Sequence, residues 1–164
     1  MIVRSGGPSD VGAVLGLLDE AVRWLVSEGR TGQWGSEPFS TNPTRVALLE
    51  AWTDDLHIAE SDGEAVGALA IGPAPEYVPP AVGPEVYVTA LVGSRRGRGA
   101  GRLLLDHARA EAVRRDADRV RVDCYAGGGG ALVAFYRSAG FTPTATFTVE
   151  GDWPGQVLEM PLRG

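Results

Sequence analysis

The chain has 164 residues, a mass of 17.2 kDa, 44% apolar residues and a single cysteine. This length is typical of one domain, and we expect a single domain over residues 1–164 that buries its core without disulfides or metals. Because Cys124 stands alone, an internal disulfide is excluded and a cysteine-based zinc site is not expected. No apolar stretch approaches the roughly 20 residues that cross a bilayer, so we expect a soluble, cytoplasmic protein without a membrane partner.

The charge of the chain excludes one broad class of function. Fifteen basic residues, all of them arginine, stand against twenty-one acidic ones, which gives a net charge of −6 and a pI near 4.9. An acidic protein repels nucleic acid phosphates, so sequence-independent binding of nucleic acids is not expected. The same charge favours a small cationic partner.

The N-terminal segment predicts a short strand followed by a long helix. Ile2 to Arg4 is the strand, and Ser9 or Asp10 is expected to cap the helix. Apolar residues then recur at helical spacing between Val11 and Leu25, and Gly29 ends the pattern.

A loop rich in Gly, Ser, Thr and Pro follows from Arg30 to Pro43, and a short helix is expected from about Thr44 to Trp52. Leu56 to Glu60 and Ala65 to Ile71 have the composition of strands. The Asp62-Gly63 dipeptide between them predicts a tight hairpin turn, because glycine tolerates a positive φ there.

The centre of the chain alternates strand and helix. Beyond a proline-rich loop that ends at Pro84, Glu85 to Val92 alternates so that one face is apolar and the other polar. Gly99 to Arg115 has helical periodicity, and Arg119 to Tyr125 is another alternating strand. Four glycines, Gly127 to Gly130, separate that strand from the next element.

The last helix has its apolar residues at Leu132, Phe135, Tyr136 and Ala139, so Tyr136 is predicted to lie on the buried side of the helix. Gly140 is its expected end. Two final strands, about Phe141 to Glu150 and Gln156 to Leu162, complete a β-α-α-β-β-β-α-β-α-β-β order.

The segment from Arg95 to Gly101 joins an apolar strand to a helix and combines three arginines with three glycines. Free backbone N–H groups and the helix dipole converge at such a junction, which favours a compact anion. The segment is not a Walker loop, since the chain has no lysine, and it does not have the spacing of the dinucleotide fingerprint. A flexible turn before a helix is the plain structural alternative.

The pattern Arg96-x-x-Gly99-x-Gly101 resembles the acyl-coenzyme A loop of the GNAT superfamily of N-acetyltransferases. The run from Phe135 to Phe141 is similar to a second family signature, a tyrosine on a helix that ends in Gly-Phe. The likeness spans nearly the whole chain. It implies an α/β (α+β) fold of three layers, with a mixed central sheet of about seven strands, splayed at its two central strands and flanked by about four helices.

The resemblance implies acetyl-coenzyme A as a co-substrate and no metal. It implies that the backbone of Thr89, Ala90 and Leu91 pairs with the pantetheine arm. The residues that would hold the pyrophosphate through their amides are Arg96, Gly97, Arg98, Gly99, Ala100 and Gly101. Family members often place an asparagine before the last helix, and this chain has Gly127 to Gly130 there instead, so that contact is not expected from a side chain.

The family resemblance also implies catalytic roles. Acyl transfer to an amine needs a base for the ammonium and an acid for the departing thiolate. Tyr136 is the predicted acid and Glu85 the predicted base, acting directly or through water. The alternatives are a core tyrosine that bonds the backbone and a solvated glutamate at a strand edge. His57 and Asp123 are the reserve bases.

The acceptor is predicted to be a small cationic amine such as a polyamine, an amino acid or an aminoglycoside. Gln33 and Trp34 lie where family members shape the acceptor pocket, and Trp34 is suited to a cation–π contact. A lid anchored by a buried Trp34 is the structural alternative. Tyr77 and Trp153 are weaker candidates for the same rim, and Cys124 is expected to serve packing.

Two rival functions remain open from the sequence. A non-catalytic acyl-coenzyme A sensor or regulatory module would carry the same loop, and a domain that binds nucleotides or another phosphate ligand is the third reading. Oligomerisation is common in the family, which leaves a homodimer through an edge strand near the C-terminus open.

Overall fold

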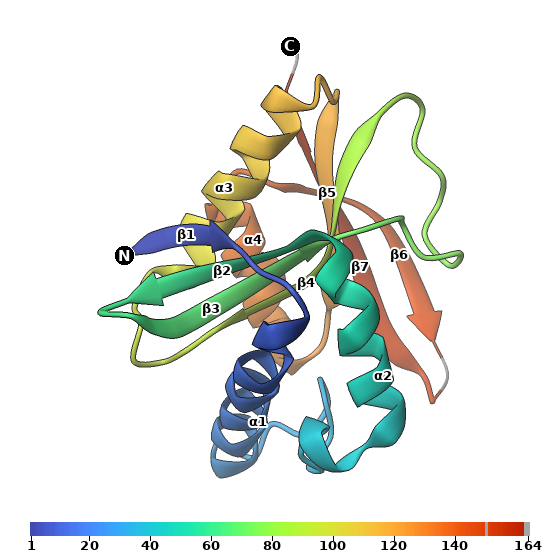
Figure 1. Cartoon of the computed structure of the whole chain (residues 1–164). Coiled ribbons are helices and arrows are strands. Elements are labelled where there is room, and N and C mark those ends of the chain that lie inside the picture. Colours follow the sequence, from blue (N-terminus) through green and yellow to red (C-terminus); the bar gives the residue numbers. More distant parts are fainter. Residues whose placement is uncertain (150, 163–164) are drawn as a thin grey trace. The chain divides into compact units, whose positions relative to one another are not determined.

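The structure is a computed structural model that describes residues 1–149 and 151–162. Seven strands form a mixed sheet in the order β1-β2-β3-β4-β5-β7-β6, accompanied by four α-helices in the described part of the chain (Figure 1). The sheet is mixed because β4 and β5 are parallel, whereas β1–β2, β2–β3, β5–β7 and β6–β7 are antiparallel. The predicted fold class and order of elements are confirmed.

The bounds of the elements lie close to those expected. The strands are β1 (Ile2–Ser5), β2 (Leu56–Ser61), β3 (Glu64–Ile71), β4 (Glu85–Gly93), β5 (Arg119–Tyr125), β6 (Thr142–Val149) and β7 (Trp153–Pro161). The helices are α1 (Val11–Ser27), α2 (Pro43–Trp52), α3 (Ala100–Arg114) and α4 (Ala131–Ser138). The last strand begins at Trp153, three residues before its predicted start at Gln156. Glu150, the predicted end of the strand before it, lies outside the described residues.

The chain divides into two compact units, which are described separately. The first comprises Met1–Ile71 and Ala90–Leu104, and the second comprises Gly72–Thr89 and Leu105–Gly164. Both β4 and α3 therefore contribute residues to each unit. A single functional domain over residues 1–164 stays a prediction.

The first unit has a core between α1, α2 and the strands β2 and β3. The buried residues of α1 form one stripe, Val14, Leu17, Leu18, Val22 and Leu25. Four of them pack in one cluster with Leu49 of α2, Ile58 of β2 and Ala68 of β3. The predicted hairpin turn is confirmed, since Asp62 and Gly63 have φ values of 52° and 79°.

Helix starts in the first unit differ in how they are capped. Asp10 precedes α1 as expected, yet its carboxylate accepts hydrogen bonds from the Gly7 amide and from Arg4 rather than from the amides of α1. By contrast, Asn42 caps α2 directly, since its Oδ1 accepts from the amides of Thr44 and Arg45 at 3.1 and 3.2 Å.

The second unit is built on β5, with β4 on one side and β7 on the other, and α4 contacts both β5 and β6. The prediction of a polar outer face on β4 is wrong at Tyr87, which is 1% exposed. Val78, from the loop before β4, and Val157 of β7 pack against the Tyr87 ring. The alternation of residues along β4 alone cannot predict that a loop from elsewhere in the chain covers this face.

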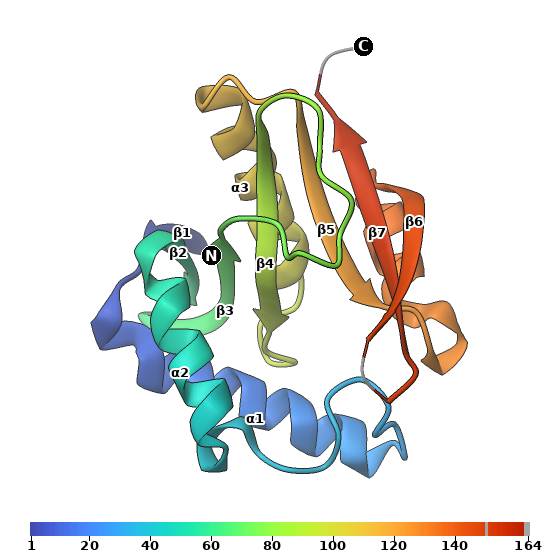
Figure 2. The ribbon, with the colours of Figure 1, turned by 90° about the vertical axis from the view of Figure 1, so that its right-hand side faces the viewer.

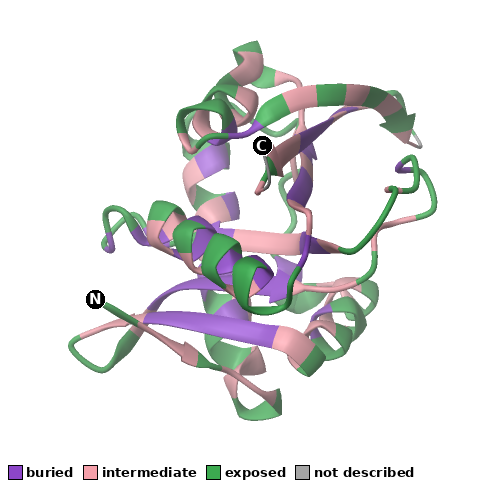
Figure 3. Cartoon of the chain, turned by 90° about the horizontal axis from the view of Figure 1, so that it is seen from above, coloured by how far each residue is buried: buried purple, intermediate pink, exposed green. Residues whose placement is uncertain are grey.

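Exposed and half-buried residues alternate along the strand β6, a pattern that Figure 3 shows by colour.

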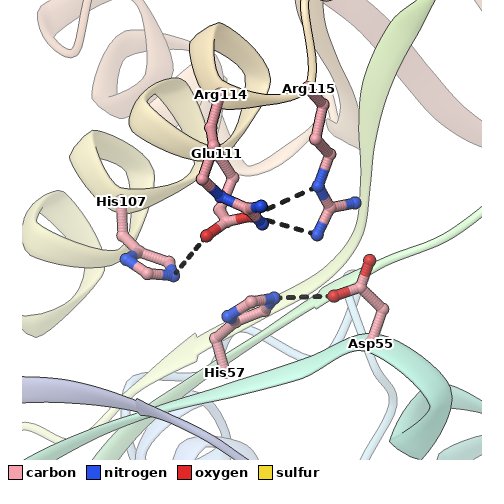
Figure 4. A network of polar contacts seen from close by, with 6 residues as sticks. All are labelled: Asp55, His57, His107, Glu111, Arg114 and Arg115. Carbon is pink, nitrogen blue, oxygen red and sulfur yellow. Dashed lines mark hydrogen bonds and ion pairs between the residues drawn. The ribbon is translucent and has the colours of Figure 1, made fainter.

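Polar side chains near α3 show how the fold compensates its charges (Figure 4). Glu111 of α3 forms ion pairs with Arg114 and Arg115, and His107 Nε2 lies 4.0 Å from its carboxylate. The hydrogen bond from Arg114 is the main reason that the pKa of Glu111 lies below its ordinary value, ahead of that from Arg115. In the first unit, Asp55 pairs with His57 at 2.8 Å.

We expect Glu111→Gln to reduce the loss of stability in acid. A carboxyl group whose pKa is lower in the folded state stabilises the protein above its unfolded pKa, about 4.3, and this contribution disappears as the pH falls through the folded pKa. Because the main partner, Arg114, is largely exposed to solvent, the effect should be about 1 kcal/mol or less. Urea unfolding at pH 7 and pH 3 measures it, with the exposed Glu50→Gln as control. Identical pH slopes for the two variants would contradict the assignment.

Candidate functional site

The loop after β4 folds as two successive tight turns on β3. The Gly97 amide donates to the Ser94 carbonyl at 3.1 Å, and the Ala100 amide donates to the Gly97 carbonyl at 3.0 Å. A Cβ atom on Gly97 would lie 2.5 Å from the Cβ of Val66 in β3, so only glycine lets the turn approach the strand this closely.

Four backbone N–H groups of this loop and the helix after it have no acceptor within the described part of the chain. These belong to Arg98, Gly99, Gly101 and Arg102, at the start of α3. Gly99 has a φ of +84°, and a Cβ built on it would meet nothing within 4 Å. Several unpaired amides at a helix N-terminus, in an exposed loop that carries arginines, fit a diphosphate group.

The structure sorts the six residues that were predicted to bind pyrophosphate. The amides of Arg98, Gly99 and Gly101 remain available, whereas those of Arg96, Gly97 and Ala100 donate within the loop, to Ser94 Oγ, the Ser94 carbonyl and the Gly97 carbonyl. The side chain of Arg96 is 70% exposed and lies 3.9 Å from Glu20 and 4.0 Å from Glu64. Its guanidinium is therefore an exposed cation of the loop.

Sequence reasoning missed the residues that anchor this loop. Glu20 of α1 accepts hydrogen bonds from Ser94 Oγ at 3.0 Å and from the Arg95 amide at 3.4 Å. The guanidinium of Arg95 lies 3.8 Å from the centre of the Trp24 ring, also on α1. The only signal for this in the sequence is that Glu20 and Trp24 are four residues apart and share a helix face.

The residues predicted to pair with a pantetheine arm lie on β4 just beyond its pairing with β5. The β4–β5 register runs from Glu85 to Val88 on β4. Thr89, Ala90 and Leu91 follow, and all three are half-buried. Their assignment to the pantetheine arm stays a prediction.

Tyr136 lies on the buried side of α4, as its spacing predicted, and is 6% exposed. Its ring makes edge contacts with Phe135 and Phe141, whose ring centres lie 5.3 and 5.7 Å away. Burial, and to a lesser degree the neighbouring Cys124 and Asp123, raises the pKa of the phenol well above its ordinary value. Among residues 1–149 and 151–162, no hydrogen bond involves the phenol oxygen, which leaves its proton available to a ligand.

Glu85 begins β4 and forms a two-point ion pair with Arg121 of β5. Arg121 Nε and Nη2 donate to its two carboxylate oxygens at 2.5 and 2.9 Å, and Arg121 Nη1 donates to the Pro79 carbonyl at 2.7 Å. Both side chains are largely buried, 16% and 7% exposed. The pair thus ties the start of β4 to β5 and to the loop before it.

Asp123 of β5, a reserve base in the sequence analysis, accepts a hydrogen bond from the hydroxyl of Tyr87. Burial raises the pKa of Asp123, and the bond from Tyr87 partly offsets this. Burial and the adjacent Asp123 carboxylate also raise the pKa of the Tyr87 phenol, which stays protonated as the donor. Tyr87 was not predicted as a site residue.

The predicted acceptor residues Gln33 and Trp34 lie in the first unit. The Trp34 ring meets Phe39 edge-on, with ring centres 5.4 Å apart, and packs against the core of that unit. The Trp34 carbonyl accepts a hydrogen bond from Arg45. Both residues are half-buried, so a role for them in acceptor binding stays a prediction.

In the part of the chain that the structure describes, no group of three or more His, Cys, Asp or Glu side chains is arranged to hold a metal ion. Within the same residues, no helix has the length and apolar character needed to cross a membrane.

Comparison with known proteins identifies the family. The model of the acetyltransferase (GNAT) family matches residues 18–141. A search of curated proteins finds no significant match.

Solved structures share the fold at low sequence identity. A ribosomal-protein-alanine N-acetyltransferase from Brucella melitensis is 21% identical with a TM-score of 0.69, and the match covers 99% of this chain and 100% of that one. YncA from Salmonella typhimurium, solved with its cofactor acetyl-CoA, is 22% identical with a TM-score of 0.68, covering 100% and 95%. A GNAT acetyltransferase from Listeria monocytogenes is 20% identical with a TM-score of 0.72, covering 98% and 94%.

We expect Gly97→Ala to destabilise the loop after β4. The added methyl group would overlap the Cβ atom of Val66. Because a Cβ atom cannot rotate away from the backbone, the loop must shift, at a cost of about 1–3 kcal/mol. Chemical denaturation measures this cost. Gly7→Ala is the matched control, since a Cβ there meets nothing within 4 Å and its backbone is extended, with φ −166°. Equal stability of both variants would show that the loop does not lie on β3 as described.

Proposed function

The chain belongs to the acetyltransferase (GNAT) family, and from this we propose that it transfers the acetyl group of acetyl-coenzyme A to the primary amine of a small, cationic acceptor. The observation that supports this most strongly is the row of unpaired amides at Arg98, Gly99, Gly101 and Arg102. The positive charge of Arg95, Arg96 and Arg98 beside these donors is a local exception to the acidic character of a chain with net charge −6.

The residues present fit the co-substrate. In the proposal the amides around Gly99 hold the diphosphate, while Arg96 and Arg98 add charge from exposed positions. The backbone of Thr89, Ala90 and Leu91 would pair with the pantetheine arm. Bound acetyl-coenzyme A supplies an acetyl thioester, which is activated toward attack by an amine.

Tyr136 is proposed to donate its proton to the departing thiolate sulfur. Burial raises the pKa of its phenol, so the group is protonated at neutral pH and available as an acid. A proton lost to the thiolate leaves a phenolate that regains a proton from solvent after turnover. The absence of a hydrogen-bond partner for the phenol among the described residues supports this role over that of a structural core tyrosine.

Glu85 is proposed to accept the proton of the incoming ammonium through a water molecule. Because both of its oxygens accept hydrogen bonds from Arg121, an ammonium in direct contact would stand close to the guanidinium, which carries the same charge. A water bound to a second lone pair of either oxygen would keep the two cations apart. In the proposal, Arg121 therefore holds the base in position.

Gln33 and Trp34 are proposed to contact the acceptor. The Brucella neighbour is named for acting on an alanine of a ribosomal protein, and the acidity of the present chain favours a cationic amine. A free amine must be neutral to attack, so the enzyme has to bind the ammonium and then remove its proton. In the proposal, Gln33 and Trp34 serve the first of these steps and Glu85 the second.

The proposal is tested by binding and turnover in the same preparation. We expect coenzyme A to raise the thermal unfolding midpoint, and Arg96→Ala to diminish that shift. Thiol release with pooled primary amines should fall about 100-fold or more in Tyr136→Phe, with an unchanged coenzyme A shift. A protein that binds coenzyme A without amine-dependent thiol release in either form would instead be an acyl-coenzyme A sensor.

Substitution of Cys124 tests whether the reaction passes through a covalent acetyl-cysteine intermediate. Burial raises the pKa of its thiol to about 12, so almost no thiolate exists at neutral pH. We expect Cys124→Ala to retain thiol release with amines within a few-fold of the wild type. Abolished turnover in a folded Cys124→Ala protein would favour an acetyl-cysteine intermediate over direct attack.

A further inference from the structure

One face of the second unit carries a row of aromatic rings and one carboxylate, Asp123, that has no cationic partner among the described residues. In the β4–β5 register Tyr87 pairs with Arg121, and in the β5–β7 register Asp123 pairs with Val157. The β6–β7 register places Phe147 opposite Gly155. Paired residues share a face, and so do residues two positions apart on one strand, such as Arg121 and Asp123, or Gly155 and Val157. The side chains of Tyr87, Asp123 and Phe147 therefore stand on the same side of these strands, which run beside one another in Figure 2.

Four rings form a continuous row on this face, here called the aromatic row: Tyr77, Phe147, Trp153 and Tyr125. Successive ring centres lie 4.8, 6.4 and 5.3 Å apart. Tyr77 is 50% exposed, and the other three rings are half-buried.

Two glycines allow the rings of the aromatic row to lie against the backbone. A Cβ on Gly155 would come within 2.2 Å of the Phe147 ring, and one on Gly127 would come within 2.2 Å of the Tyr125 hydroxyl. The row is thus fixed by close packing, and it is not a chance group of exposed side chains.

The charges on this face are paired except at one position. The strands β4, β5 and β7 carry three carboxylates, of which Glu85 pairs with Arg121 and Glu159 pairs with Arg119. Asp123 has no cationic partner among the described residues, and its bond from Tyr87 Oη engages Oδ2 only. Its second oxygen remains an acceptor for a donor from a ligand.

We propose that this face binds the acceptor, and that the acceptor is a primary amine with one positive charge on an aromatic or apolar carrier. The inference rests on the proposed function and narrows its substrate class. The ammonium would donate to Asp123, and the carrier would stack on the aromatic row.

The arrangement disfavours polyamines and aminoglycosides, which carry several ammonium groups. A second ammonium would find no free carboxylate on these strands, since Glu85 and Glu159 are already occupied by arginines. It would also approach the Arg121 guanidinium, which lies 5.5 Å from the centre of the Tyr87 ring. Two cations brought together on a partly buried face repel each other.

Replacement of Asp123 should leave the fold intact. Because burial raises the pKa of this carboxyl, its charged form costs stability as the pH rises above the ordinary aspartate value of about 3.9. A neutral asparagine of the same shape still accepts the bond from Tyr87. Asp123→Asn should therefore unfold at the same or a higher temperature than the wild type at pH 7.

The test compares 2-phenylethylamine with spermidine, by calorimetric binding to the coenzyme A-loaded protein and by thiol release from acetyl-coenzyme A. We expect kcat/KM at least tenfold higher for 2-phenylethylamine. Asp123→Asn should raise its KM and Kd at least tenfold without changing the affinity for coenzyme A, and Phe147→Leu should raise both several-fold. The exposed Asp106→Asn on α3 is the matched control and should change neither.

The outcomes separate this inference from the proposed function. Turnover of spermidine with no preference for 2-phenylethylamine, or an Asp123→Asn variant that binds 2-phenylethylamine as the wild type does, overturns the inference and leaves the acetyltransferase proposal standing. Asp123-dependent binding of 2-phenylethylamine without thiol release supports the amine site and overturns the proposed catalysis. Binding of 2-phenylethanol as tight as that of the amine also overturns the inference, because the charge would then play no part.

Discussion

The packing of Gly97 on Val66 is the constraint on which the coenzyme A proposal depends. Because the two turns of the loop lie on β3 and use the amides of Gly97 and Ala100, the neighbouring amides at Arg98, Gly99, Gly101 and Arg102 are left without an acceptor among the described residues. Glu20 then holds the start of the loop from α1. The donors near Gly99 are thus arranged before any ligand binds, and the ordering cost that weakens flexible anion sites is avoided.

Local patterns in the sequence were sufficient to predict the helices, strands and turns, whereas contacts between distant segments could not be predicted from it. The periodicity of α1 and α4, the Asp62-Gly63 turn and the position of Tyr136 were predicted correctly because each depends on neighbouring residues. Tyr87 was expected on a polar face and is buried, because Val78 from the loop before β4 packs with it. No alternation within β4 can report such a covering loop.

The same limit applies to the candidate site. The motif around Gly99 located the loop, but it did not separate the amides that are free from those that the turns consume. The ion pair of Glu85 with Arg121 joins residues 36 positions apart, and the bond from Tyr87 to Asp123 spans the same separation. Both depend on the parallel register of β4 and β5, which the sequence does not specify. The predicted base Glu85 is therefore already paired with an arginine in the fold. Asp123, which the sequence offered only as a reserve base, has no cationic partner among the described residues.

Because Glu85 is paired and Asp123 is not, the net charge of the chain does not by itself predict which acceptor binds. The charge of −6 suggested affinity for cations in general, yet a charge that is already paired cannot attract a ligand at close range. On the face formed by β4, β5 and β7, pairing reduces three carboxylates to one, and rings occupy the surrounding surface. Long-range charge then brings an amine to the protein, while the number of unpaired carboxylates decides how many ammonium groups it can hold. A carrier that matches the rings gains binding where a second charge would lose it.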